Sequence, residues 1–319
     1  MADPPISTSS APAVSILMPF LDPGPYIGDA IASVQAQTFA DWELLLIDDG
    51  TRDGSLALAQ ESAETDPRIS VLPALSSGPL GAAAARNRAL SAARGPLVAF
   101  LDADDLYEPG MIARHVELMA RFRQAAMVYG PTYWWHPDDP ASDRIESMGT
   151  LAGRLHEAPS LLISVLLLCE SPVPCTCAVT IRSDILRKAG GFDETFRLYE
   201  DQTAWAHIML DYPVYIDDAN AARYRQHSKS VSARASAAGD YYMHERHPAR
   251  FRFLEYVDSL AREHPHEARI RWASRKARWR MQHQGRAWYR AWRRLRRAGL
   301  KLAGRPGGSF RRPPSPAKG

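Results

Sequence analysis

Short apolar runs alternate with amphipathic stretches along the first hundred residues that follow Val14. The apolar runs have the length of β-strands and occupy residues 14–18, 43–47, 69–72 and 97–101. The first segment between them has the apolar spacing of a helix with one buried face, at Ile27, Ala30, Ile31 and Val34. Continuous apolar strands that alternate with helices are typical of a parallel sheet covered on both faces. The pattern predicts an α/β fold.

The pattern becomes less regular after Pro109. It still predicts helices at residues 109–123, 161–168 and 183–189 and from Glu200 onward, strands at 126–129, 177–181 and 214–216, and a loop at 224–232. Helical patterning returns from residue 240 and continues to Gly304, after which the Gly, Pro, Ser and Arg content predicts a disordered end. We therefore expect a disordered tail at 1–13, a domain at 14–235, a basic helical extension at 236–303 and a second tail at 304–319.

The composition is that of a globular chain, with 319 residues of which 45% are apolar and 24% charged. The longest apolar run has nine residues, 161–169, whereas a membrane-spanning helix needs roughly 20. Residues 1–13 do not have the pattern of an export signal. The cysteines, Cys169, Cys175 and Cys177, form no C-x-x-C pair and predict neither a disulfide framework nor a zinc site. We expect a cytoplasmic protein that does not cross a membrane.

Charge is divided unequally along the chain. Residues 1–239 carry 18 Lys and Arg against 30 Asp and Glu, whereas residues 240–319 carry 21 against 6, so the net charge of +3 hides an acidic body and a basic tail. Tryptophans recur among the arginines of residues 268–303, at Trp272, Trp279, Trp288 and Trp292. A helix of this kind either lies on an anionic membrane surface or packs on the body. Nucleic acid is a less favoured partner, because no nucleic-acid-binding module accompanies the basic segment.

Acidic residues follow two of the predicted strands. Asp102 and Asp104 come directly after the strand at 97–101, at the sheet edge where α/β proteins bind ligands. Their oxygen atoms suit Mg²⁺ or Mn²⁺, which are commonly held by one or two carboxylates together with substrate phosphates. A capped turn is the alternative for this pair. Asp48 and Asp49 end an earlier strand, and they either accept hydrogen bonds from a nucleotide's base or ribose or form a β-turn.

Four further side chains complete the candidate set. Arg86 lies on a predicted alanine-rich helix and either contacts a base or phosphate or is a solvated helix residue. Glu200 and Asp201 open a predicted helix, where a carboxylate either acts as a general base or stabilises the helix N-terminus electrostatically. His227 is a candidate metal or phosphate ligand, although a lone loop histidine is more often neither.

Taken together, these segments resemble the family-2 inverting glycosyltransferases of the GT-A fold. The resemblance covers about residues 14–232. It is carried, in order, by VSILMPF from Val14, IASVQAQTF from Ile31, WELLLIDDGTRDGS from Trp42, AAARNRAL from Ala83, FLDADD from Phe100, GGFDE from Gly190, YED from Tyr199 and YRQHSKSVS from Tyr224. One departure is the loop FLDPGP after the first strand, where the family commonly has Tyr-Asn. The resemblance implies a Rossmann-like, mostly parallel sheet flanked by helices, followed here by the basic extension.

The resemblance also implies a chemistry for the candidate residues. A nucleotide-diphosphate sugar would be bound by Pro19, Asp48, Asp49, Arg86 and Asp102. Mn²⁺ or Mg²⁺ would be held by Asp104, with Asp102 and His227 as further ligands. Asp201 would take the proton of the acceptor hydroxyl, so that one in-line displacement inverts the anomeric centre. The acceptor side would be formed by Gly190, Gly191 and Glu200.

The resemblance further implies the setting of the reaction. The acceptor would be a saccharide or a lipid-linked sugar, as in the synthesis of cell-surface polysaccharide or glycolipid. We expect the enzyme in the cytoplasm, with a peripheral position on the inner face of the cell membrane if the basic segment 268–303 binds lipid.

Two other classes of protein share parts of this pattern. A phosphatase with an aspartyl nucleophile also places D-x-D after an apolar strand, but it expects Thr or Val two positions after the second Asp, where this chain has Leu106. A non-catalytic nucleic-acid-binding or membrane-binding protein built on a degenerate GT-A body predicts that the carboxylates at the metal and base positions are lost. They are present, so the sequence favours the enzyme.

Overall fold

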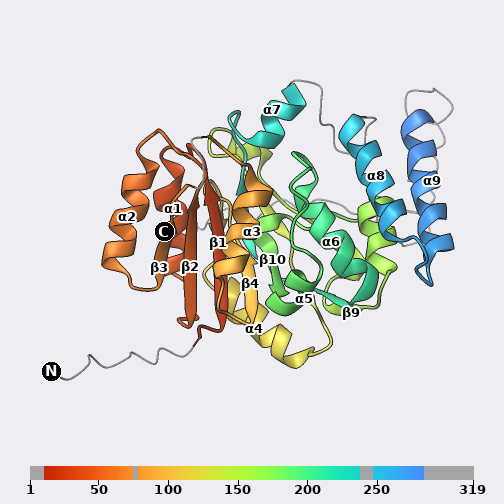
Figure 1. The fold of residues 1–319 in the computed structure, drawn as a ribbon, viewed down its shortest axis with the longest axis horizontal. Coiled ribbons are helices and arrows are strands. Elements are labelled where there is room, and N and C mark those ends of the chain that lie inside the picture. The colour runs from red at the N-terminus through yellow and green to blue at the C-terminus, as the bar shows by residue number, and fades with distance from the viewer. Residues whose placement is uncertain (1–10, 75–77, 238–246, 284–319) are drawn as a thin grey trace.

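The predicted apolar runs build one half of a central sheet (Figure 1). The computed structural model describes residues 11–74, 78–237 and 247–283. Its first elements are β1 (Val14–Phe20), α1 (Tyr26–Gln35), β2 (Trp42–Asp48), α2 (Ser55–Thr65), β3 (Ile69–Leu72), α3 (Ala82–Ala92) and β4 (Leu97–Phe100). Strands β3, β2, β1 and β4 lie side by side in that order and run parallel. Every residue of β2 and β4 is buried, which confirms the prediction of a parallel sheet covered on both faces.

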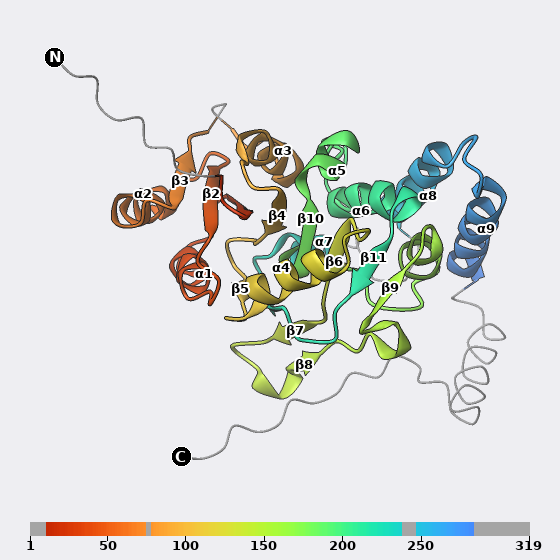
Figure 2. The ribbon, with the colours of Figure 1, turned by 90° about the horizontal axis from the view of Figure 1, so that it is seen from below.

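The second half of the chain extends this sheet in mixed directions. Its elements are β5 (Leu106–Tyr107), α4 (Met111–Arg121), β6 (Met127–Tyr129), β9 (Arg154–His156), β10 (Val179–Arg182), α5 (Ser183–Lys188), α6 (Glu200–Asp211) and β11 (Val214–Ile216). The eight strands follow the order β3-β2-β1-β4-β10-β6-β11-β9, with β10 and β9 antiparallel to their neighbours. Helices α3, α5 and α6 cover one face, and α1 and α4 cover the other (Figure 2). The predicted α/β fold is therefore confirmed, with a mixed sheet.

A second sheet of four strands contains segments that the sequence pattern did not resolve. It has the order β5-β12-β7-β8, with β7 (Thr132–Trp135), β8 (Arg144–Ile145) and β12 (Ala222–Arg225). The predicted loop at 224–232 is partly wrong, because Tyr224 and Arg225 pair with β7 and Val231 begins helix α7 (Val231–Ala237). Strand β12 receives its partners from much earlier in the chain, and no local periodicity reports such a pairing.

Several short helical turns connect these elements. They are the 3₁₀ turns η1 (Pro140–Ser142), η2 (Gly149–Leu151) and η4 (Thr176–Ala178), and the π-helix η3 (Leu162–Leu167). The helix predicted at 161–168 is thus present and largely buried, but it has the wider π form. The strand predicted from Cys177 begins only at Val179, because Cys177 and Ala178 belong to η4.

Helix α8 (Pro248–Leu260) packs beside α6, and helix α9 (Glu267–His283) packs on α8 and η3 (Figure 1). Their inward side chains belong to the same apolar core as α6 and η3, and they are Phe253, Leu254, Val257, Ile270, Ala273, Ala277 and Met281. The described part of the predicted extension is therefore joined to the body by apolar contacts. Residues 1–10 of the predicted tail at 1–13 lie outside the described residues. The predicted tail at 304–319 lies outside them as well, as do Trp288 and Trp292. The boundary at residue 235 stays a prediction.

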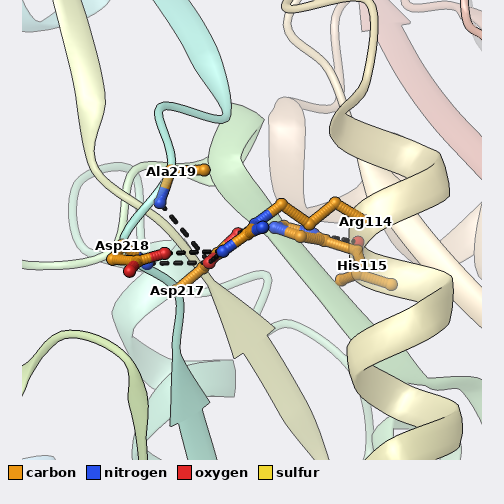
Figure 3. Close-up of polar contacts among 6 residues, drawn as sticks. Arg114, His115, Asp217, Asp218 and Ala219 are labelled. Carbon is orange, nitrogen blue, oxygen red and sulfur yellow. Dashed lines mark hydrogen bonds and ion pairs between the residues drawn. The ribbon is translucent and has the colours of Figure 1, made fainter.

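An ion pair between the partly exposed Arg114 and the buried Asp217 ties α4 to the end of β11 (Figure 3). The guanidinium of Arg114 donates to both carboxylate oxygens of Asp217 at 2.6 Å and to Asp218 at 2.5 Å. Burial alone would raise the pKa of Asp217, but the hydrogen bonds and charge of Arg114 outweigh it and the pKa lies below its usual value. Asp217 also accepts hydrogen bonds from the backbone of Asp218 and Ala219, so one carboxylate orders the turn that leads to β12.

We expect Arg114→Met to lower the free energy of unfolding by about 2 kcal/mol at pH 7, because Asp217 stays buried without its cation. Since the native pKa of Asp217 is depressed, this stabilisation is fully present above the carboxyl's unfolded pKa of about 4 and is lost as the pH falls from there through the lower native pKa. Urea unfolding followed by circular dichroism at the two pH values measures the difference. Arg262→Met, at an exposed position, is the matched control. Equal losses in both variants would contradict the assignment.

Candidate functional site

A cleft of about 2600 Å³ opens at the carboxyl ends of β1, β2 and β4. It is lined by eight of the residues that the sequence singled out, which are Pro19, Asp49, Arg86, Asp102, Asp104, Glu200, Asp201 and His227. These residues come from strand ends, from α3, from the start of α6 and from the segment after β12. The fold therefore gathers most of the predicted site around a single space.

The turn after β4 presents two carboxylates to this cleft. Asp102 Oδ1 accepts a hydrogen bond from Arg86 Nη2 at 2.5 Å, and Asp104 Oδ2 lies 2.9 Å from His227 Nε2. Both carboxylates are partly exposed. The ring of His227 packs on Tyr26 at a centroid distance of 4.9 Å, which fixes its orientation. A carboxylate and an imidazole thus meet at one point of the cleft wall, and both are ligands for divalent metal ions.

Arg225 binds this turn and was not among the candidate residues predicted from the sequence. Its side chain donates from Nε to the carbonyl of Asp104 at 2.8 Å, and its backbone N–H donates to Asp105 Oδ1 at 2.9 Å. The guanidinium lies over the rings of Tyr26 and Trp135, at 4.5 and 4.3 Å from their centroids. Its only sequence signal is its place in the YRQHSKSVS segment, two residues before His227.

The guanidinium of Arg86 joins the two sides of the cleft. Arg86 is 3% exposed, and it contacts Asp102 with Nη2 and Glu200 Oε1 with Nη1 at 3.3 Å. Burial opposes its charge, but the two carboxylates outweigh burial and raise its pKa. Arg86 is therefore a buried cation that holds the β4 turn to the start of α6, and the alternative of a solvated helix residue is wrong.

Asp201 lies on the first turn of α6, next to Glu200. Burial raises the pKa of Asp201 to about 7, the negative charge of Glu200 adds to the rise, and the charge of Arg86 opposes it. Tyr199, directly before this pair, has a left-handed backbone with φ of 72°. A carboxyl group with a pKa near neutrality on a cleft wall is suited to accept a proton.

Three residues of the candidate set do not line the cleft. Asp48 Oδ1 accepts hydrogen bonds from the backbone of Gly50 and Thr51, which is the β-turn that the sequence left open. Gly190 and Gly191 both have positive φ, and a Cβ on Gly191 would lie 2.4 Å from an oxygen of Asn87. Gly190 therefore serves the turn through its positive φ, and Gly191 also allows a close approach to α3. Their roles in binding remain predictions.

Asp49 lines the cleft, but its carboxylate already has partners. Its two oxygens accept hydrogen bonds from the backbone N–H groups of Leu80 and Gly81, both at 2.8 Å. A nucleotide that bonds to this carboxylate would have to share or displace these donors.

The C-terminal helix α8 also reaches the cleft, which the sequence did not predict. Arg250 lines the cleft and donates to the carbonyls of Leu166 and Leu167 at 2.6 and 3.0 Å. The hydroxyl of Tyr199 lies 3.1 Å from His247 Nε2 at the start of α8, and its ring stacks on Phe253. The segment that carries Glu200 and Asp201 is thus supported by a helix far along the chain.

Comparison with known proteins agrees with this geometry. The model of "Glycosyl transferase family 2" matches residues 15–190. The putative teichuronic acid biosynthesis glycosyltransferase TuaG of Bacillus subtilis is 37% identical over 112 residues, which are 35% of this chain and 44% of that protein. The Escherichia coli UDP-Glc:alpha-D-GlcNAc-diphosphoundecaprenol beta-1,3-glucosyltransferase WfgD is 28% identical over 222 residues, or 69% of this chain and 79% of that one. For TuaG and the B. subtilis glycosyltransferases EpsJ and EpsH, the match spans less than half of the relative's length.

Solved structures share the fold at low sequence identity. TarS of S. aureus in complex with UDP-GlcNAc superposes with a TM-score of 0.64 at 16% identity, covering 91% of this chain and 75% of that one. The mannosyltransferase PcManGT of Pyrobaculum calidifontis, in complex with GDP-Man and Mn²⁺, gives a TM-score of 0.52 at 19% identity over 92% and 81% of the two chains. These likenesses confirm the GT-A architecture. Because the family model matches more than half of this chain's length, the chain belongs to glycosyl transferase family 2.

Proposed function

We propose that the protein is a metal-dependent inverting glycosyltransferase that moves a sugar from a nucleotide-diphosphate donor to an acceptor hydroxyl. The observation that carries this proposal is the buried Arg86, which contacts both Asp102 at the β4 turn and Glu200, next to Asp201, at the start of α6. A carboxylate turn suited to a metal and a carboxyl group suited to a base thus line one cleft. A displacement reaction needs groups that stabilise the leaving group and activate the nucleophile within reach of one reacting carbon.

The residues at the β4 turn fit a hard divalent cation. Asp104 is partly exposed to the cleft, and His227 Nε2 lies beside its carboxylate. The buried His227 Nδ1 has no hydrogen-bond partner among the residues that the structure describes. Asp104 and His227 would hold Mn²⁺ or Mg²⁺, with Asp102 turned toward Arg86 and left to face the donor's ribose. When bound, the ion would neutralise the negative charge that develops on the leaving diphosphate.

Asp201 would act as the general base on the acceptor side. A base is most effective when its pKa lies near the working pH, and the pKa of Asp201 is about 7. Arg86 limits the rise in pKa, so that an appreciable fraction of the carboxyl groups is ionised at neutral pH. Glu200 is held by Arg86 and would position the acceptor rather than take its proton.

The relatives suggest the class of product. TuaG is named for teichuronic acid biosynthesis, and WfgD is named for a diphosphoundecaprenol-linked acceptor. We infer a role in the synthesis of polysaccharide or glycolipid, with a saccharide or lipid-linked acceptor. The alternative of a non-catalytic binding protein on a degenerate body requires lost carboxylates, and Asp102, Asp104 and Asp201 all line the cleft.

Helix α9 has an outer face that would contact the membrane in which a lipid-linked acceptor is held. Among the described residues no helix has the length and apolar content needed to span a bilayer. Helix α9 packs on the body through Ile270, Ala273, Ala277 and Met281, while Trp272 and Trp279 are exposed. Arg269, Trp272, Lys276 and Trp279 follow one another at helical spacing on this outer face. We propose that this face binds an anionic membrane surface peripherally, since tryptophan and basic side chains together favour such an interface.

We expect UDP or GDP to raise the melting temperature only slightly without a metal and markedly with Mn²⁺, because the ion binds both the diphosphate and Asp104. At a nucleotide concentration of 100 times Kd the stabilisation is about 2.7 kcal/mol. Asp104→Asn should remove the Mn²⁺-dependent part. Asp138→Asn, at an exposed site away from the cleft, should behave like the wild type. A nucleotide shift that does not depend on Mn²⁺ in any of these proteins would argue against the proposed metal site.

The rate at low substrate concentration should rise as the pH increases through about 7, because Asp201 must be ionised to accept a proton. Asp201→Asn should lower kcat/KM by about 10²- to 10⁴-fold and leave the Kd for nucleotide nearly unchanged. Glu200→Gln should move the acidic limb of the pH profile to lower pH, since the charge of Glu200 raises the pKa of Asp201. A limb that moves upward, or an Asp201→Asn variant with near-normal kcat/KM, would refute the assignment.

Vesicle co-sedimentation tests the outer face of α9. The double variant Trp272→Ala/Trp279→Ala should bind vesicles that contain phosphatidylglycerol roughly tenfold more weakly than the wild type, because two buried aromatic contacts with the interface are lost. Leu58→Ala, at another exposed apolar residue on α2, is the matched control. Unchanged binding of the double variant would exclude this face as the membrane contact.

A further inference from the structure

Behind the β4 turn, one carboxylate and two thiols converge on a small buried site. The side-chain ligand atoms of Asp105, Cys175 and Cys177 all lie within 4.8 Å of one another, and the two sulfur atoms are 3.3 Å apart. Asp105 belongs to the turn between β4 and β5, whereas the cysteines lie at the start of η4 and within it. Asp105 and Cys177 are buried, and Cys175 lines the cleft.

The carboxylate of Asp105 is only half satisfied. Its Oδ1 accepts the backbone N–H of Arg225 at 2.9 Å, but Oδ2 receives no hydrogen bond from a nitrogen or oxygen donor in the described part of the chain. Only the weak S–H donor of Cys177 is near it. In the described ranges no basic side chain donates a hydrogen bond to this carboxylate, and Asp102 and Asp104 add negative charge nearby. Because Asp105 is 1% exposed, the ionised carboxylate is costly unless a cation binds to it.

The ligand types distinguish this site from the one in the cleft. Two sulfur atoms and one carboxylate oxygen suit Zn²⁺, which takes cysteine and carboxylate ligands in tetrahedral geometry, whereas Mg²⁺ and Mn²⁺ prefer oxygen ligands such as those of Asp104. We propose that Asp105, Cys175 and Cys177 bind a zinc ion, with a fourth position open toward the cleft beside Cys175. This inference does not rest on the proposed glycosyltransferase activity.

The cysteine spacing predicts no zinc site, for an identifiable reason. The two cysteines form a C-x-C pair, which lacks the spacing of common zinc motifs, and the third ligand lies far away in the chain. The fold brings them together because η4 packs against β4 and β12. A zinc ion there would join the cleft wall at Cys175 to the turn that carries Asp104, the residue next to Asp105.

Zinc binding would deprotonate both thiols. The hydrogen bond with Cys175 and burial both raise the pKa of Cys177, and the pKa of Cys175 is also raised, so the two thiols hold their protons at neutral pH. Each zinc ion that binds should therefore release at least two protons, which a weakly buffered solution with a pH indicator detects.

The test uses the full-length chain, freed of metal and kept reduced. Competition with a chromophoric chelator should show one equivalent of bound zinc in the wild type and at least about tenfold weaker binding in Cys175→Ser, which keeps the size of the side chain. Cys169→Ser, the matched cysteine control, should bind zinc like the wild type. Replacing zinc with Co²⁺ should give thiolate charge-transfer absorption in the wild type and in Cys169→Ser, and a reduced band in Cys175→Ser.

Three results would overturn the proposal. The first is a wild-type chain that binds no equivalent of zinc. The second is zinc binding of equal strength in Cys175→Ser and Cys169→Ser, provided that circular dichroism shows both to be folded. The third is zinc binding that Asp104→Asn weakens and Cys175→Ser does not, which would place the ion in the cleft.

Discussion

One buried cation organises the functional end of this molecule. Arg86 has almost no exposed surface, and its guanidinium contacts Asp102 at the end of the central sheet and Glu200 at the start of α6. A charge in that position is stable only because both carboxylates are there, and the carboxylates in turn keep their places because of it. Arg86 and Glu200 also influence the pKa of Asp201, since Glu200 raises it and Arg86 lowers it. The contact between the β4 turn and α6 and the pKa of Asp201 thus depend on the same side chain.

Two further arginines, Arg225 and Arg250, bind the elements next to Arg86 and its two carboxylate partners. Arg225 binds the backbone of the β4 turn and lies two residues before His227, which contacts Asp104, so the second sheet supports both of these side chains. Arg250 binds the carbonyls at the end of η3, while Phe253 of the same helix stacks on Tyr199, directly before Glu200 and Asp201. The C-terminal helices are therefore part of the structure that shapes the cleft. The zinc site proposed at Asp105 would add a third support behind the same turn.

The sequence allowed the parallel half of the fold to be predicted because each element there has its own periodicity. Strands β1 to β4 and the buried face of α1 read directly from apolar spacing, and Asp102, Asp104 and Asp201 stood out as acidic residues at element ends. Strand β12 and the π form of η3 were not predicted, because their geometry depends on distant partners. Arg225 and Arg250 were not predicted as site residues for the same reason, since nothing in the local sequence distinguishes a buried arginine from a solvated one. Asp48 and Gly191 show the reverse case, in which a motif residue serves a turn.

The carboxyl carbon of Asp201 offers the most direct test of this account. Its ¹³C chemical shift, followed by NMR from acid to neutral pH in the full-length protein, reports the ionisation of this group without any assumption about substrate. The account predicts a midpoint at about 7, set by burial and by Glu200 against the charge of Arg86. A midpoint near the ordinary value of 3.8 would contradict it, because Asp201 would then lie in open solvent with no influence from Glu200 or Arg86.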